Sequence, residues 1–208
     1  MAAPGRYLLH AHPESGNCYK VALLLSLLGQ RFDYRPVALF EGATHTEEFR
    51  KLNRFEEIPV LEHGATVLCQ SGTILTYLAE QRGSYGGRTP DEKRAIQEWI
   101  LWENHRLLNG PALMRFIRRF AQQTDPAVLT FLKPRAERAL GQLECALQSA
   151  PFLVGGRATI ADIACCGYLY WLDQSGLDPA RWPAIQRWLG RIEALPGFKA
   201  PDEIWPRG

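Results

Sequence analysis

The segment RGSYGGRTPD, residues 82–91, separates two stretches of different texture. Short alternating runs of strand and helix character precede it, whereas the residues after it show only long helical periodicity. The segment itself contains three glycines and a proline, a composition typical of loops. The sequence therefore predicts two domains, at residues 1–82 and 91–208, joined by a linker over residues 83–90.

The first 82 residues carry strand and helix signals in the order β-α-β-α-β-β-α. The run NCYKVALLLSLLG has apolar residues at helical spacing, and Gly29 is a typical glycine at a helix C-terminus. Pro36 favours an edge position for the second strand, because proline cannot donate to a central ladder. This order predicts a four-stranded sheet covered by helices. The strand candidates are RYLLHA, FDYRPVAL and the two halves of IPVLEHGATVLC, and the other helix candidates are THTEEFRKLN and SGTILTYLAEQR.

Beyond residue 91 the pattern predicts an all-α helical bundle. The run TIADIACCGYLYWL is apolar nearly all round, which is typical of the buried central helix of a bundle. It opens with Thr159 and Asp162 at the spacing of a capping box. Pro134 lies inside another helical pattern and predicts an early kink or a later start of that helix. The predicted fold is thus an α/β domain followed by an all-α domain.

Composition excludes several classes of function. The 208 residues carry a formal net charge of +2 with no long Lys/Arg run, so nucleic acid and anionic membrane surfaces are poor candidate partners. The longest largely apolar run, residues 21–28, is far short of the ~20 residues that span a bilayer, and the first residues lack the pattern of a secretory signal. Five cysteines without CxxC or metal-ligand spacing indicate reduced thiols, a cytoplasmic location and no metal.

Two motifs one hairpin apart predict a site for a peptide with a carboxylate. A cis Ile58–Pro59 bond at the head of a strand would turn the Ile58 backbone outward, toward an extended peptide. Gln70 and Ser71 fall at a predicted helix N-terminus, where Ser71 suits the N-cap and free N–H groups favour an anion. Taken singly, each motif also has a purely structural interpretation: Pro59 could be a trans proline of an edge strand, and Ser71 could be a plain helix cap.

The stretch HPESGNCYKVALLLSLLG places three polar residues just before an apolar helix, either as a helix cap or as groups that hold a ligand. Together with IPVL, QS, the linker and TIADI, this order of motifs resembles the cytosolic glutathione S-transferases. SGNCYKV is similar to the motif of bacterial and theta-like, serine-using members. The resemblance covers essentially the whole chain. It implies a thioredoxin-like first domain, a helical second domain, glutathione as co-substrate without a metal, and a homodimer.

The resemblance also implies roles for particular residues. Gln70 and Ser71 would hold the γ-glutamyl end, and Ile58 before Pro59 would pair with the cysteinyl backbone. His45 would lie near the glycine carboxylate, or it is a solvated loop histidine. The donor to the glutathione thiol would be Ser15, then Asn17, then Cys18 in order of preference.

Two further expectations concern the pocket for the electrophilic substrate and a loop that departs from the family pattern. The electrophile pocket would lie between the domains, although most of its candidate residues could equally belong to the core. Arginines at 115, 118 and 119 could instead draw an anionic acceptor. The family usually reads Asn-Pro-x-Gly before the cis-proline strand, whereas this chain has Asn53-Arg-Phe-Glu56-Glu57, so two carboxylates would approach the glycine end of the site. The pocket candidates are His12, Met114, Phe116, Phe120 and Tyr168.

The expected function is conjugation of the glutathione thiolate to a small hydrophobic electrophile, as in detoxification. The alternatives are glutathione-dependent disulfide or peroxide reduction, and a non-catalytic glutathione-transferase-like binding protein. The altered loop at residues 53–57 is the feature that favours the last of these.

Overall fold

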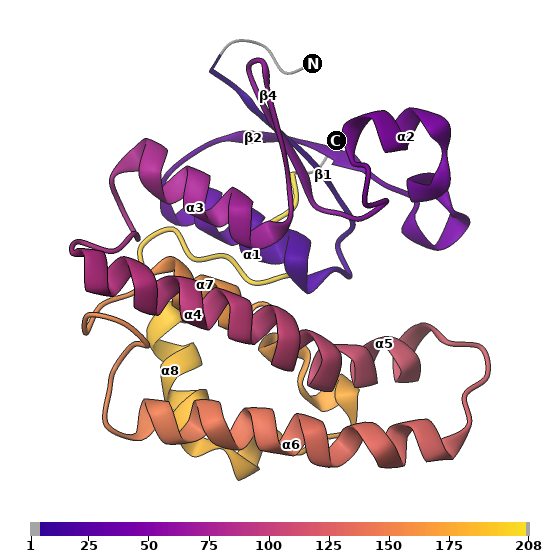
Figure 1. Ribbon diagram of the computed structural model, residues 1–208, viewed down its shortest axis with the longest axis vertical. Coiled ribbons are helices and arrows are strands. Elements are labelled where there is room, and N and C mark those ends of the chain that lie inside the picture. The colour runs from indigo at the N-terminus through magenta and orange to yellow at the C-terminus, as the bar shows by residue number, and fades with distance from the viewer. Residues whose placement is uncertain (1–4, 207–208) are drawn as a thin grey trace. The chain divides into compact units, whose positions relative to one another are not determined.

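The computed structural model describes residues 5–206 (Figure 1). Residues 1–4 and 207–208, the outer ends of the two predicted domains, lie outside the described part. The chain forms two compact units, one from residues up to 84 together with residues from 195 onward, the other from Tyr85 to Ala194. Sequence reasoning assigned everything after residue 91 to the helical domain, whereas the structure groups residues 195–206 with the first unit.

The first unit has the predicted order of elements. Its four-stranded sheet has the strand order β2-β1-β3-β4, with β1 parallel to β2 and antiparallel to β3, and β3 antiparallel to β4. The strand that contains Pro36 lies at the edge, as predicted. The elements are β1 (Tyr7–Ala11), α1 (Gly16–Leu27), β2 (Phe32–Pro36), α2 (Glu47–Leu52), β3 (Val60–His63), β4 (Thr66–Cys69) and α3 (Ser71–Arg82).

Helix α1 is the core helix of this unit. It packs beside α3, as Figure 1 shows, and ten of its twelve residues are buried. Residues beyond 195 cover a further part of it, since the Ser26 hydroxyl donates to the Gly197 carbonyl at 2.6 Å and the Tyr19 hydroxyl donates to the Lys199 carbonyl at 2.9 Å. This cover explains why α1 is apolar around most of its circumference.

The second unit is helical, as predicted. All seven residues of the helix that begins at TIADI are buried, which confirms the predicted central helix. That helix ends at Cys166, and short 3₁₀ turns replace the longer helix that the apolar run indicated. Pro134 lies inside a helix that begins at Pro126, so the predicted later start is wrong. The helices are α4 (Pro90–Arg106), α5 (Leu113–Phe120), α6 (Pro126–Gln148), α7 (Ile160–Cys166) and α8 (Pro183–Glu193).

Asp162 joins the start of α7 to its surroundings. Its buried carboxylate accepts hydrogen bonds from the Thr159 backbone N–H at 2.9 Å and from the Thr159 hydroxyl at 3.0 Å. It also accepts from the Leu153 N–H and the Trp188 indole N–H, both at 2.9 Å. The predicted capping box is therefore present, and the same carboxylate ties α7 to α8.

Within residues 5–206, none of the helices combines the length and apolar character needed to cross a bilayer.

Candidate functional site

Three connections that carry predicted site residues meet at one end of the sheet. Val60 pairs with His10 of β1 on one side and with Cys69 of β4 on the other. At this level β1 and β4 end and β3 begins, and neighbouring strands lie about 4.8 Å apart. The three connections are consequently close enough for one short extended peptide to contact all of them. They are the loop 12–15, the Ile58–Pro59 pair and the Gln70–Ser71 pair.

Two helices begin at the same end of the sheet. Helix α1 follows β1 and helix α3 follows β4, and these two strands run in the same direction. The first turn of each helix presents unpaired backbone N–H groups and the positive end of the helix dipole. Neither first turn contains an acidic side chain that would occupy these donors. This end of the unit therefore favours a ligand with negative groups.

Ser15 is the N-cap of α1. Its hydroxyl oxygen accepts a hydrogen bond from the Cys18 backbone N–H at 3.3 Å, and its own N–H donates to the His12 carbonyl at 3.0 Å. A serine hydroxyl that accepts one hydrogen bond still has its own proton to donate. The cap role and the ligand-donor role predicted for Ser15 are therefore compatible.

Asn17 is held by a lysine that sequence reasoning missed. The Lys20 ammonium donates to the Asn17 side-chain carbonyl at 2.8 Å, and Lys20 is fully buried, with 0% of its surface exposed. The signal was present in the sequence, because residues three apart on a helix are neighbours and a lysine in an apolar helix needs a polar partner.

Cys18 lies inside the core of the first unit. It has no exposed surface, and burial raises the pKa of its thiol to about 12, even though the Ser15 side chain, the His12 backbone and the Lys20 charge all act in the opposite direction. A thiol that is both buried and protonated is a poor nucleophile. The structure therefore argues against Cys18 as the group that faces a ligand thiol.

Ile58 and Gln70 have unusual backbone positions. The Ile58–Pro59 bond is cis, and Ile58 lies just outside the strand pairing, which begins at Val60. Gln70 has a φ of +68°, which is uncommon for a residue other than glycine and is often found at functional sites. Gln70 occupies the N-cap position of α3, so Ser71, expected there, is instead the first helical residue.

The side chain of Gln70 is fixed by a neighbouring loop. Its amide nitrogen donates to the Glu57 carboxylate at 2.8 Å. The Asn53 side chain closes the loop, donating to the Glu57 carbonyl at 2.6 Å and accepting from the Phe55 N–H at 3.0 Å. Because its nitrogen is bound to Glu57, the amide oxygen of Gln70 is the atom left to accept a hydrogen bond from a ligand.

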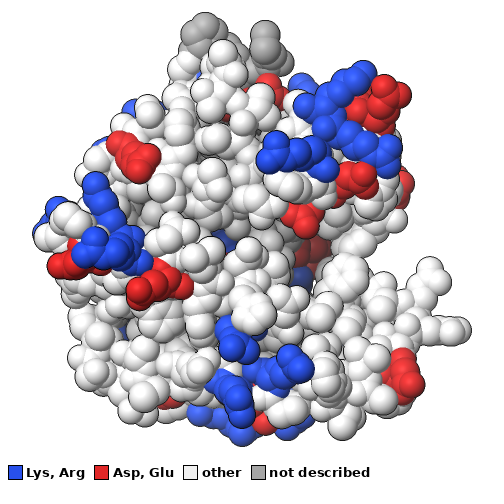
Figure 2. Space-filling model, in the orientation of Figure 1, with Lys and Arg blue, Asp and Glu red and all other residues white. Residues whose placement is uncertain are grey.

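Glu56 occupies the position where the related pattern has glycine. Its φ of +58° is the backbone geometry that glycine adopts most easily. Its carboxylate pairs with the His45 ring at 2.5 Å and with Arg50 at 2.6 Å, and these partners lower its pKa. Figure 2 shows basic and acidic side chains intermixed over α2 in this region. The Glu56 charge is thus balanced locally, by the same His45 that was expected to serve the ligand.

Comparison with known proteins identifies the family. Residues 9–89 match the glutathione S-transferase N-terminal domain and residues 111–196 match the glutathione S-transferase C-terminal domain. The disulfide-bond oxidoreductase YfcG of Escherichia coli is 30% identical over 191 residues, which cover 86% of this chain and 87% of that protein. This chain belongs to the glutathione S-transferase family.

Solved glutathione S-transferases have the same fold. A glutathione S-transferase from Pseudomonas fluorescens is 32% identical with a TM-score of 0.90, covering 94% of this chain and 98% of that one. One from Xanthobacter autotrophicus is 29% identical with a TM-score of 0.88, covering 95% and 98%. These likenesses confirm the predicted fold class, an α/β thioredoxin-like domain followed by a helical domain.

The glutathione S-transferase pocket residues predicted in the helical unit have different environments. Met114 is buried in the core with 1% exposed, whereas Phe116 is 49% exposed and its ring lies 5.9 Å from that of Phe120. Tyr168 is half-buried. Arg115 is buried over the Trp171 ring, so it belongs to the interior of the unit and does not attract a ligand from solvent.

His12, the fifth pocket candidate, lies in the first unit. Its ring stands edge-on to Phe40 at 5.1 Å, and burial lowers its pKa although Glu14 acts in the opposite direction. The grouping of these five residues into one pocket stays a prediction. Within residues 5–206, no group of three or more His, Cys, Asp and Glu side chains is arranged to hold a metal ion.

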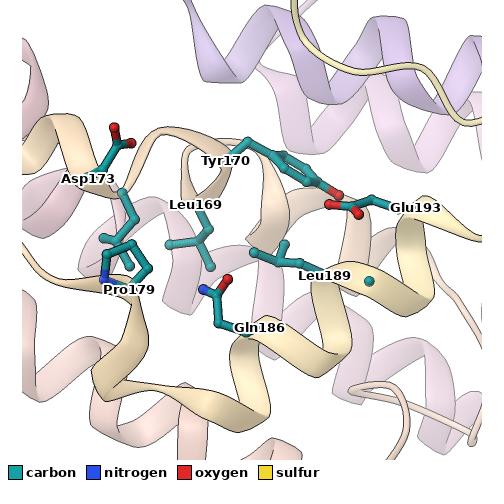
Figure 3. Close-up of a pocket in the computed structure, with 9 residues that line it drawn as sticks. Leu169, Tyr170, Asp173, Pro179, Gln186, Leu189 and Glu193 are labelled. Carbon is teal, nitrogen blue, oxygen red and sulfur yellow. The ribbon is translucent and has the colours of Figure 1, made fainter.

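The helical unit contains an open pocket of about 330 Å³, shown in Figure 3. It lies between α8 and the 3₁₀ turns that follow α7, and none of the predicted pocket residues lines it. Its walls combine leucine side chains with exposed carboxylates. The lining residues are Leu169, Tyr170, Leu172, Asp173, Pro179, Gln186, Leu189, Gly190 and Glu193.

Proposed function

We propose that this member of the family binds glutathione at the end of its four-stranded sheet and transfers the thiolate to a small hydrophobic electrophile. The observation that carries the proposal is the meeting of three features at that end: the start of α1 with Ser15, the backbone of Ile58 just before the strand pairing of β3, and Gln70 at the start of α3. A γ-Glu-Cys-Gly tripeptide has a thiol, an extended backbone and a γ-glutamyl carboxylate to match these features in turn.

Each part of glutathione has a partner in this arrangement. The γ-glutamyl carboxylate would bind the first N–H groups of α3 and the Ser71 hydroxyl, while its ammonium would bind the Gln70 amide oxygen and the nearby Glu57 carboxylate. The cysteinyl backbone would pair with Ile58 in the manner of an added strand. Glu57, which the sequence presented as unfavourable, gains a role at the ammonium end. The glycine carboxylate would lie toward His45.

The thiol would bind near the start of α1, where Ser15 and Asn17 are the candidate donors. An ordinary thiol has a pKa of about 8.5, so little thiolate exists at neutral pH. Lowering that pKa by ~2 units requires ~2.7 kcal/mol, which one charge-assisted hydrogen bond and a helix dipole can supply. The thiol proton passes to solvent, and the sulfur forms a bond to the electrophilic carbon as the leaving group departs with the bonding electrons.

The test compares Ser15→Ala with Asn17→Ala and a matched control, Ser149→Ala, at an exposed serine of the helical unit. The measurements are glutathione affinity by calorimetry and the rate of conjugation to an activated chloronitrobenzene. We expect Ser15→Ala to lower the rate at pH 6.5 by about fivefold to fiftyfold, as a rise of one to two units from a thiol pKa of about 6.5 would do. An unchanged rate refutes the role of Ser15. Failure of the wild type to bind glutathione would refute both enzymatic readings and favour the non-catalytic one.

A second candidate function is glutathione-dependent disulfide reduction, and the similarity to YfcG favours it. Because Cys18 is buried and protonated, the reaction would use two glutathione molecules, which together reduce one disulfide to two thiols and leave as glutathione disulfide. The distinguishing assay follows glutathione disulfide formed from a small disulfide substrate, with the wild type and with Cys18→Ala. Equal rates support this route, and loss of activity in Cys18→Ala overturns it.

A cytoplasmic location, a role in detoxification and a homodimeric state accompany this proposal. The location is inferred from the cysteine pattern and the other two from the family resemblance, and light scattering of the purified protein tests the oligomeric state directly.

A further inference from the structure

Lys20 occupies an unusual place for a charged residue. It lies in the second turn of α1, between the buried Tyr19 and Val21, and none of its surface is exposed. Burying an ammonium group is unfavourable unless polar groups compensate it. One of those groups is identified: the side-chain carbonyl of Asn17, at 2.8 Å.

This hydrogen bond sets the orientation of the Asn17 amide. An asparagine side chain has an acceptor oxygen on one branch and a donor NH₂ on the other. With the oxygen bound to Lys20 inside the protein, the NH₂ group must point away from Lys20. Asn17 is only half-buried and lies in the first turn of α1, two residues after Ser15, at the helix start where the thiol site is proposed.

We propose that Lys20 is a positioning residue for the thiolate: it holds the Asn17 amide with its NH₂ group toward the glutathione sulfur and places a buried positive charge behind it. This inference rests on the proposed function. The ammonium hydrogen bond also polarises the amide, which makes the NH₂ group a stronger donor. Lys20 does not touch the sulfur and acts through Asn17.

Other titratable groups also lie around this point. Cys18 stays protonated, because burial raises its pKa to about 12. His12 is kept largely neutral, because burial lowers its pKa. Glu14 is the acidic side chain of the same loop, and it acts on His12. The first turn of α1 itself contains no acidic residue.

The expected effect follows from the length of the relay. One hydrogen bond, one amide group and a second hydrogen bond place the ammonium about 8 Å from the sulfur. At that distance, with an effective dielectric constant of about 20, removal of one charge raises a thiol pKa by about 1.5 units. For a wild-type bound thiol pKa of about 6.5, the thiolate fraction at pH 7 would fall by about eightfold.

The test is a pH titration of the ultraviolet absorbance of bound glutathione thiolate. Lys20→Met keeps the length and apolar character of the stem and removes the charge, and Lys133→Met removes a charge from an exposed position in the helical unit. We expect Lys20→Met to raise the bound thiol pKa by about one unit or more with the affinity for S-methylglutathione unchanged, Lys133→Met to have no effect, and Lys20→Arg to restore much of the shift. A bound thiol pKa within about 0.3 unit of the wild type in Lys20→Met overturns the proposal.

A double mutant separates positioning from a direct effect of charge. If Lys20 acts partly through Asn17, Lys20→Met should change the thiol pKa less in an Asn17→Ala background than in the wild type, because only the through-space effect of the charge would remain. Equal shifts in both backgrounds would refute the positioning role. If the wild type itself shows no lowered thiol pKa, the proposed function fails first, and that outcome is distinct from an unchanged Lys20→Met.

One measurement needs no variant and remains decisive if Lys20→Met does not fold. In nuclear magnetic resonance spectra of the unmodified protein, glutathione should shift the Asn17 NH₂ and Lys20 ammonium signals more than S-methylglutathione, which cannot form a thiolate. Equal shifts with both ligands would contradict the proposal.

Discussion

Replacing Asp162 with alanine should destabilise the helical unit more than the removal of any ordinary helix cap. The side chain is 0% exposed, and its carboxylate accepts four hydrogen bonds from Leu153, Thr159 and Trp188. Alanine would leave four donors without this acceptor, three of them on the backbone or hydroxyl of the α7 entry and one on the α8 tryptophan.

The magnitude can be worked out from these four bonds. Each buried donor left unpaired costs about 1 kcal/mol at the low end of the usual range, so the four together cost about 4 kcal/mol. That sum agrees with the 3–5 kcal/mol typical of breaking one side of a buried charged network. A matched control is Asp125→Ala at the start of α6, where an exposed carboxylate accepts one hydrogen bond from the Ala127 N–H at 2.8 Å. There we expect a loss of about 1 kcal/mol.

Urea unfolding followed by far-ultraviolet circular dichroism measures both variants without relying on Trp188 fluorescence. We expect the midpoint of Asp162→Ala to fall several times further than that of Asp125→Ala. Equal shifts for the two variants would refute the argument, because they would show that the extra three hydrogen bonds contribute nothing.

Three further predictions follow. Arg157 and the Arg88 N–H lower the pKa of Glu92 to about 2, so the contribution of Glu92 to stability is full above about pH 4.5 and is lost as the pH falls toward 2. Glu92→Gln should therefore make the melting temperature depend less on pH in this acid range. A pH dependence equal to that of the wild type would contradict the argument. In the native protein, iodoacetamide should modify the exposed Cys145 and leave Cys18 unmodified until urea is added, as mass spectrometry of peptides would show; early modification of Cys18 would refute its burial. Gln70→Gly should leave the melting temperature unchanged, because glycine readily adopts the φ of +68°. The same variant should bind glutathione about tenfold more weakly, because it lacks the Gln70 side chain. An unchanged affinity in calorimetry would show that Gln70 is not part of the site.

Much of the first unit was predictable because its signals are local. The spacing of the apolar residues indicates each strand and helix. Pro36 indicates an edge strand, and Gly29 indicates the C-terminus of a helix. The pairs Ile58–Pro59 and Gln70–Ser71 were placed correctly at the ends of strands, since those positions depend only on where each strand starts and stops.

Other features depend on contacts that a single sequence does not display. Ser71 seemed the natural N-cap, but the unusual backbone of Gln70 moves the start of α3 by one residue. The residues after Thr159 are apolar on every side, so their periodicity does not change at Cys166 and gives no sign that α7 ends there. The pairing of Glu56 with His45 and Arg50 could not be predicted, because neither helical nor strand periodicity brings these residues together.

The docking of residues 195–206 onto the first unit has a consequence for synthesis of the chain. During translation, residue 195 emerges 111 positions after residue 84, which takes about 6–22 s at ordinary elongation rates. For that time the ribosome carries a first unit whose strands and helices are all present but whose α1 lacks the partners supplied by Gly197 and Lys199. The first unit is therefore begun first and completed only after the entire helical unit has been made.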